Sequence, residues 1–185
     1  KRSLDRFRLD GLRALVSGAG RGLGHACALA LAEAGAEIIA LSRTLDELEK
    51  LQLDIQSDGG TADIAVCDAA DPDQISEIVP KLGQIDILVN NAGIQIEKQV
   101  PESTEEDWEN VMGTNAKGGL NVCRAIIPVI STRGSIINIG SISGGVADTS
   151  MALYKAPKAF VHGLSRSDPL LSIIVLTYGA RSLHQ

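Results

Sequence analysis

Residues 12–36 read LRALVSGAGRGLGHACALALAEAGA, and this stretch decides the fold. It opens with a short apolar run of strand length that ends at Gly18. Residues 25–36 are rich in alanine and leucine, as expected for a helix, and Gly35 is a good C-terminal stop. A cluster of glycines separates the two runs. The stretch therefore predicts a strand, a glycine-rich turn and a helix in direct succession.

The same alternation of apolar strands and helices continues along the chain. We expect strands at residues 37–43, 61–68, 84–93 and 134–141, and helices at residues 45–60, 71–83, 104–130 and 151–167. Strands that are apolar on both faces and separated by helices indicate a parallel sheet covered on both sides. Because parallel crossovers are right-handed, we expect an α/β fold with a doubly wound parallel sheet, the Rossmann fold, as a single domain over residues 1–185.

Composition argues against several classes of partner. The chain has 185 residues, of which 44% are hydrophobic and 22% charged, and its net charge is −6. A negative chain offers no basic face to nucleic acid, and its apolar runs fall far short of the roughly 20 residues that span a membrane. The three cysteines lie far apart without metal-ligand spacing. We therefore expect no metal site, and reduced thiols in a cytoplasmic protein.

The glycine turn has the features of a dinucleotide site. Glycine here lets the backbone turn tightly and approach a pyrophosphate, whose charge then meets the helix N-terminus. The spacing Gly-x-x-x-Gly-x-Gly is present, whereas the commoner Gly-x-Gly-x-x-Gly fails because its third place is Leu23. The alternative is a turn that needs its glycines for packing alone. The candidate cofactor-binding residues of the turn are Gly18, Gly20, Arg21, Gly22, Leu23 and Gly24.

Five motifs in this order resemble the short-chain dehydrogenase/reductase family. They are the glycine turn at residues 17–24, NNAG at residues 90–93, GTNAKG at residues 113–118, INIGSISG at residues 137–144 and Tyr154-x-x-x-Lys158. The resemblance covers residues 12–166 and implies hydride transfer between a carbonyl and a secondary alcohol. It also implies that Asn91, Ala92 and Gly93 line the adenosine side of the cofactor.

The resemblance implies a catalytic set of Ser141, Tyr154, Lys158 and Asn115. Tyr154 and Lys158 lie four residues apart, on one face of a helix, where a nearby ammonium is expected to lower the pKa of the phenol. Tyr154 would act as the acid or base, and Ser141 would stabilise charge on the substrate oxygen. In the family, the lysine also holds the nicotinamide ribose and the asparagine orders a water in a proton relay. Pro157 departs from the family pattern, and its cost is small if the helix begins near Ala152.

The end of the second strand favours NADP(H) as the cofactor, with NAD(H) as the alternative. An NAD site usually has a carboxylate here for the ribose hydroxyls, but this chain has Ser42 followed by Arg43. Arg21 in the glycine turn is a second guanidinium for a 2′-phosphate. Asp68, after the third strand, resembles the family residue that contacts the adenine amino group.

The resemblance ends after Arg166. The family continues with a sixth strand, a Pro-Gly turn at the nicotinamide and a substrate lid, which this sequence lacks. SIIVLTYGA, from Ser172 onward, resembles the family's last strand instead. We expect that a segment is absent from the sequence between about residues 167 and 172, with a true deletion as the alternative.

Two classes of function follow from these observations. The first is an NADP(H)-dependent oxidoreductase acting on a small carbonyl or alcohol, with a sugar acid or polyol (gluconate 5-dehydrogenase-like) and a 3-oxoacyl thioester (3-oxoacyl reductase-like) as substrate classes. The second is an inactive NADP-binding sensor or truncated regulatory form, against which the intact catalytic set argues. The resemblance also implies a homodimer or homotetramer.

Overall fold

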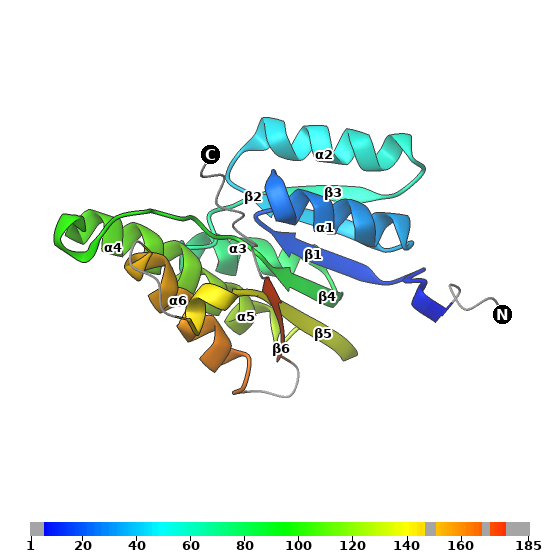
Figure 1. The fold of residues 1–185 in the computed structure, drawn as a ribbon. Coiled ribbons are helices and arrows are strands. Elements are labelled where there is room, and N and C mark those ends of the chain that lie inside the picture. Colours follow the sequence, from blue (N-terminus) through cyan, green and yellow to red (C-terminus); the bar gives the residue numbers. More distant parts are fainter. Residues whose placement is uncertain (1–5, 147–150, 168–170, 177–185) are drawn as a thin grey trace, which may run out of the picture.

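A six-stranded parallel sheet forms the centre of the molecule (Figure 1). The computed structural model describes residues 6–146 and 151–167, and the main chain of residues 171–176. The strand order is β3-β2-β1-β4-β5-β6, and every pairing is parallel. The strands are β1 (Arg13–Ser17), β2 (Glu37–Ser42), β3 (Ala62–Val66), β4 (Ile85–Asn90), β5 (Ile130–Ser141) and β6 (Leu171–Leu176).

Helices cover both faces of this sheet (Figure 1). On one side lie α1 (Gly22–Glu33) and α2 (Leu45–Ser57), and on the other lie α3 (Pro72–Leu82), α5 (Gly119–Ile126) and α6 (Ala152–Leu164). Helix α4 (Glu105–Met112) precedes α5 and packs against α6. The doubly wound parallel sheet predicted from the sequence is confirmed.

Two hydrophobic clusters, one on each face, hold the layers together. Successive residues of β1 alternate between them: Ala14 and Val16 face α1 and α2, whereas Leu15 faces the opposite helices. Leu15, Leu88 and Ile136 are fully buried. Burying one such side chain contributes about 1.5–3 kcal/mol, so the apolar strands account for much of the stability of the fold.

The sheet places a binding crevice between β1 and β4. The chain builds outward from β1 to β3 and then from β4 to β6, so the connections reverse direction between these two central strands. Ser17 and Asn90, the last residues of β1 and β4, lie opposite each other in the register. Ligands of open α/β sheets bind at such a switch point, outside the carboxyl ends of the strands.

The long helix predicted at residues 104–130 is interrupted. A π-helical turn, η3 (Gly113–Gly118), separates α4 from α5, and the chain is already a strand from Ile130. Close packing explains the glycines that follow it, because a β-carbon on Gly119 would lie 3.2 Å from Asn90 Nδ2. Single π turns inside α-helices are frequent at functional sites.

Residues 171–176 form the sixth strand of this sheet. Residues Leu171–Leu176, taken from the sequence as the last strand after a gap, pair in parallel with β5 and occupy the sixth position. Helix α6 supplies the crossover that a parallel pair requires. The expectation that a segment is absent between about residues 167 and 172 stays a prediction.

Candidate active site

A cavity of about 1140 Å³ opens at the carboxyl ends of the strands. It runs from the glycine turn, past the ends of β2 and β3, to the end of β5 and the start of α6. Two of the predicted site residues, Gly24 and Asn115, do not line it. The predicted residues that do line it are Gly18, Gly20, Arg21, Gly22, Leu23, Ser42, Arg43, Asp68, Asn91, Ala92, Gly93, Ser141, Tyr154 and Lys158.

The glycine turn fits a pyrophosphate. Gly18 and Gly22 have φ of 66° and 59°, in the left-handed region that favours glycine. A β-carbon on Gly24 would collide with the carbonyl oxygen of Gly18, so Gly24 lets α1 start directly against the turn. The cap residue Arg21 makes no side-chain cap, and the space beside Gly22 is open. The N–H groups of the first turn of α1 are thus available to an anion.

Hydrogen bonds join the NNAG segment to the glycine turn. Asn91 Nδ2 donates to the carbonyl oxygens of Ser17 and Gly18, at 3.1 and 3.2 Å. Ser17 Oγ in turn accepts from the N–H groups of Asn91 and Ala92, at 3.0 and 3.1 Å. The side chain of Asn91 therefore fixes the shape of the cofactor site.

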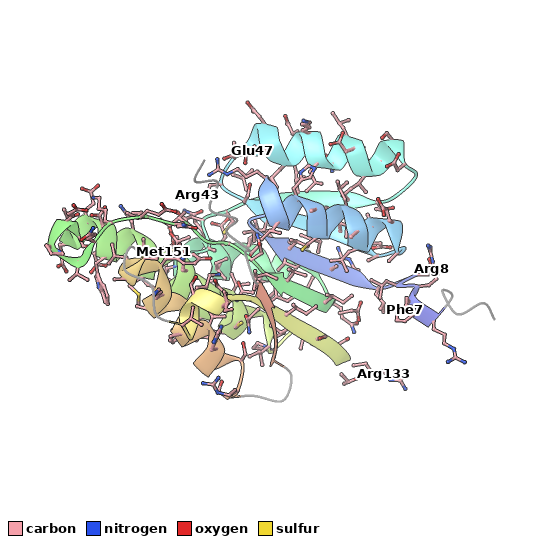
Figure 2. The ribbon with its side chains drawn as sticks, viewed as in Figure 1. Phe7, Arg8, Arg43, Glu47, Arg133 and Met151 are labelled. Atoms are coloured by element: carbon pink, nitrogen blue, oxygen red, sulfur yellow. The ribbon has the colours of Figure 1, made fainter. Side chains whose placement is uncertain are left out.

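The end of the cavity beside the glycine turn and α2 holds the charged residues that the sequence predicts to bind the adenosine part of the cofactor. Arg43, whose side chain is 62% exposed, forms an ion pair with Asp68, at 3.7 Å between Nη1 and Oδ2. Arg21 is also exposed. Sequence reasoning missed Glu47, which enters the cavity from the first turn of α2. No motif marks Glu47, because it reaches the site through the direction of a helix. Figure 2 shows Arg43 and Glu47 at this end of α2, and Met151 at the start of α6.

Three of the four predicted catalytic residues, Ser141, Tyr154 and Lys158, lie together at the other end of the cavity. Ser141 ends β5, and its hydroxyl is hydrogen-bonded to that of Tyr154. Lys158 Nζ lies 5.5 Å from the centroid of the Tyr154 ring and donates to the carbonyl oxygen of Ile139 at 2.7 Å. Helix α6 begins at Ala152 and continues through Pro157, so both side chains remain on one face. The predicted spatial pairing of Tyr154 and Lys158 is confirmed.

The expectation that Lys158 lowers the pKa of Tyr154 was wrong for this structure. Burial raises the pKa of the phenol above its usual value, and the hydrogen bond from Ser141, which favours the phenolate, only partly opposes this. Burial also lowers the pKa of Lys158 to about 8. The ammonium lies over the face of the ring and donates a hydrogen bond to the Ile139 carbonyl oxygen. This placement explains why it does not lower the pKa of the phenol.

Asn115 supports the cavity wall from behind. It lies in the π-helical turn η3 and is 4% exposed. Its Oδ1 accepts from the Ile94 N–H at 2.7 Å, and its Nδ2 donates to the Ile94 carbonyl at 2.8 Å. The side-chain amide of Asn115 therefore forms two hydrogen bonds with the backbone of Ile94, one as acceptor and one as donor. A role in a proton relay stays a prediction.

The loop after β4 contributes wall residues that sequence reasoning missed, namely Ile94, Gln95 and Glu97. At its end, Lys98 Nζ donates to Asp107 Oδ2 at 2.6 Å, and Lys98 pairs through its backbone with Met151. Asp107 also accepts from the N–H and hydroxyl of Thr104. These bonds tie the loop to α4 and to the start of the catalytic helix.

A second set of buried bonds positions α6 against β5. Asn138 Nδ2 donates to Ser165 Oγ at 3.0 Å, and Ser165 Oγ donates to the Val161 carbonyl at 2.8 Å. Asn138 Oδ1 accepts from Asn90 Nδ2 at 3.0 Å. This chain of bonds connects the end of β4 to the helix that carries Tyr154 and Lys158.

Among the described residues, neither a metal cluster nor a reactive cysteine is found. None of the helices they form is long and apolar enough to cross a membrane, and they hold no cluster of three metal-ligating side chains. The three cysteines are free thiols. Burial raises the pKa of Cys67 and of Cys123 to about 11, so both stay protonated and unreactive near neutral pH.

Known proteins match this chain over most of its length. Gluconate 5-dehydrogenase from Gluconobacter oxydans (strain 621H) is 38% identical over 170 residues, which cover 88% of this chain and 66% of that protein. The 3-oxoacyl-(acyl-carrier-protein) reductase FabG from Thermotoga maritima is 36% identical over 167 residues, with coverages of 87% and 68%. The chain thus spans about two thirds of the length of these relatives.

Solved structures agree with the sequence relatives. A gluconate 5-dehydrogenase from Burkholderia cenocepacia J2315, crystallised with NADP and tartrate, superposes with a TM-score of 0.83 at 39% identity. The match covers 92% of this chain and 71% of that chain. The family model of the short chain dehydrogenases matches residues 13–168, which include the glycine turn and the catalytic helix. The chain therefore belongs to the short-chain dehydrogenase family.

Proposed function

We propose that this chain is an NADP(H)-dependent oxidoreductase that interconverts a carbonyl and a secondary alcohol, with residues 1–185 as one dinucleotide-binding and catalytic domain. One observation carries the proposal: the hydrogen-bonded hydroxyls of Ser141 and Tyr154 line the same cavity as the glycine turn. The relatives and the solved structure with NADP support the reaction and the cofactor.

Tyr154 moves the proton in this proposal. When bound, the nicotinamide supplies the hydride in reduction and accepts it in oxidation. In reduction, the substrate oxygen gains negative charge and takes a proton from Tyr154 Oη, while the Ser141 hydroxyl donates a hydrogen bond to the same oxygen. The raised pKa of Tyr154 keeps the phenol protonated near neutral pH, which suits an acid. In the reverse direction, the charge of Lys158 would stabilise the phenolate.

Two substrate classes are proposed, a sugar acid or polyol and a 3-oxoacyl thioester. Relatives with these activities match this chain at similar identity, 38% and 36%. The substrate end of the cavity is mixed in character, with Gln95 and Ser143 beside Ile142, Val146 and Met151. Screening both classes is therefore the direct way to assign the substrate.

The experiment is an NADPH oxidation assay with a carbonyl panel that includes 5-keto-gluconate and an acetoacetyl thioester. Tyr154→Phe removes the proton but keeps the ring, so we expect turnover to fall by about 10²–10⁴-fold and NADPH binding to persist. Ser141→Ala should also lose turnover, and Ser131→Ala is its control, because Ser131 lies at the opposite end of β5 and does not line the cavity. Full turnover by Tyr154→Phe would contradict the mechanism, and NADPH binding without turnover on any carbonyl would favour the sensor.

We also propose that copies of this chain associate through α4, α5 and α6, as a homodimer or homotetramer. Trp108, Leu120 and Phe160, one on each of these helices, are 43%, 40% and 37% exposed. Exposed aromatic and aliphatic side chains on neighbouring helices suit a subunit contact. Light scattering after size-exclusion chromatography tests this, and Phe160→Glu should lower the measured mass.

A further inference from the structure

The carboxylate of Glu47 lies beside the end of β2, a strand that itself ends without an acidic residue. Glu47, in the first turn of α2, packs against the glycine turn: a β-carbon built on Gly20 would collide with Glu47 Oε2. The same β-carbon would lie 3.0 Å from Glu47 Cβ and 3.1 Å from Ser42 Oγ. Glu47 and Ser42 therefore converge on one point, between the glycine turn and the end of β2, and both line the cavity.

This point is where dinucleotide folds place the adenosine ribose. In such folds an acidic side chain accepts a hydrogen bond from the ribose 2′-hydroxyl of NAD, or an arginine accommodates the 2′-phosphate of NADP. Here both kinds of residue are present, because Arg43 lies at the same edge of the cavity (Figure 2). The absence of a side chain on Gly20 is what leaves room for the carboxylate.

The charges at this end of the cavity balance. Arg21 and Arg43 are positive, whereas Glu47 and Asp68 are negative. Asp68 already pairs with Arg43, at 3.7 Å. No ion pair of Glu47 occurs among the described residues, so its negative charge acts on whatever occupies the ribose site.

We infer that Glu47 limits the preference of this chain for NADP over NAD. Its carboxylate would accept a hydrogen bond from the ribose 2′-hydroxyl of NAD and repel the 2′-phosphate of NADP. The inference rests on the proposed function, since it concerns the same cofactor site. It makes the chain a dual-cofactor enzyme in which the arginines favour NADP and Glu47 retains NAD. The carboxylate comes from the first turn of α2 instead of from the end of β2.

The test is calorimetric titration of the intact protein with NADP⁺ and with NAD⁺, which needs no substrate. The measured quantity is the ratio of the NAD⁺ to the NADP⁺ dissociation constant. Glu47→Gln keeps the shape and removes the charge, so we expect the ratio to rise roughly tenfold, the effect of one charge a few ångströms away at a partly exposed site. Arg43→Gln should change the ratio in the opposite direction.

Asp46→Asn is the matched control. Asp46 is the neighbouring acidic residue in the first turn of α2, it is exposed, and it does not line the cavity. The control should leave the ratio within about twofold of wild type, as expected for an exposed charge in water. Equal ratios for the Glu47→Gln and Asp46→Asn variants would overturn the inference but leave the proposed function intact. If wild type bound neither dinucleotide, both the inference and the proposed function would fail.

Discussion

Lys158 and Tyr154 are stacked, with the lysine Nζ 5.5 Å from the centroid of the tyrosine ring and hydrogen-bonded to the Ile139 carbonyl. The lysine is 6% exposed, and burial lowers its pKa to about 8 from a usual value of 10.5. The pair therefore combines a phenol that resists losing its proton with an ammonium that gives one up easily. The protonation of Lys158 should be visible in the stability of the protein.

Lys158→Met isolates the contribution of Lys158 to stability. Between about pH 8 and 10.5 the unfolded chain binds a proton at this lysine that the folded protein does not, so the free energy of unfolding rises with pH. Relative to Lys158→Met, wild type should gain roughly 2 kcal/mol between about pH 7 and pH 9.5. Urea unfolding at both pH values measures this, and a difference that stays constant with pH would show that Lys158 keeps its usual pKa.

Gly24→Ala should disrupt the cofactor turn. A β-carbon there would collide with the Gly18 carbonyl of the turn and lie 2.5 Å from Asn91 Nδ2, which is hydrogen-bonded to the turn. We expect a loss of about 1–3 kcal/mol in stability, as for other overpacked sites, and a clear loss of NADP⁺ affinity. Gly163→Ala is the control, because nothing lies within 4 Å of its added carbon and alanine favours a helix. Unfolding and calorimetry measure the two effects, and an unaffected Gly24→Ala variant would contradict the packing.

Asn115→Leu should loosen the loop after β4. The substitution leaves the partly buried N–H and carbonyl of Ile94 without their side-chain partners, a loss of up to about 1–3 kcal/mol for each unsatisfied group. Hydrogen exchange of the peptide covering residues 91–97 should become faster. The control is Asn110→Leu, which alters an exposed asparagine of α4. Equal exchange rates in the two variants would show that Asn115 does not support the wall.

Asp107→Asn should cost stability at neutral pH but not in acid. The Lys98 ammonium and the Thr104 donors lower the pKa of Asp107 to about 2 from 3.8. This contribution is present above about pH 4 and is lost as pH falls through about 2, because the unfolded chain takes up the proton first. The difference in urea midpoint between wild type and Asp107→Asn should therefore shrink with acidity. Glu106→Gln, at an exposed neighbour, serves as the control, and a gap that persists in acid would argue against the ion pair.

The alternation of apolar strands and helices was enough to predict the sheet. Strands that are apolar on both faces require cover on both sides, and the cofactor motifs lie at the strand ends because a parallel sheet brings these ends to one edge. The spacing of Tyr154 and Lys158 was equally readable, since residues four apart share a helical face. The pairing of residues 171–176 with β5 was not readable from the sequence, because the composition of a strand does not say which neighbour it pairs with.

The sequence by itself determined the class of fold, the order of the motifs and many of the residues that line the cavity. These follow from local periodicity and from glycines whose backbone conformation few other residues adopt. Only the tertiary structure decided how those residues behave. The pKa of Tyr154 depends on burial and on where the Lys158 ammonium lies, and Glu47 reaches the ribose site only because α2 packs against Gly20. Burial and helix direction arise from packing between segments far apart in the chain, so no short stretch of sequence encodes them.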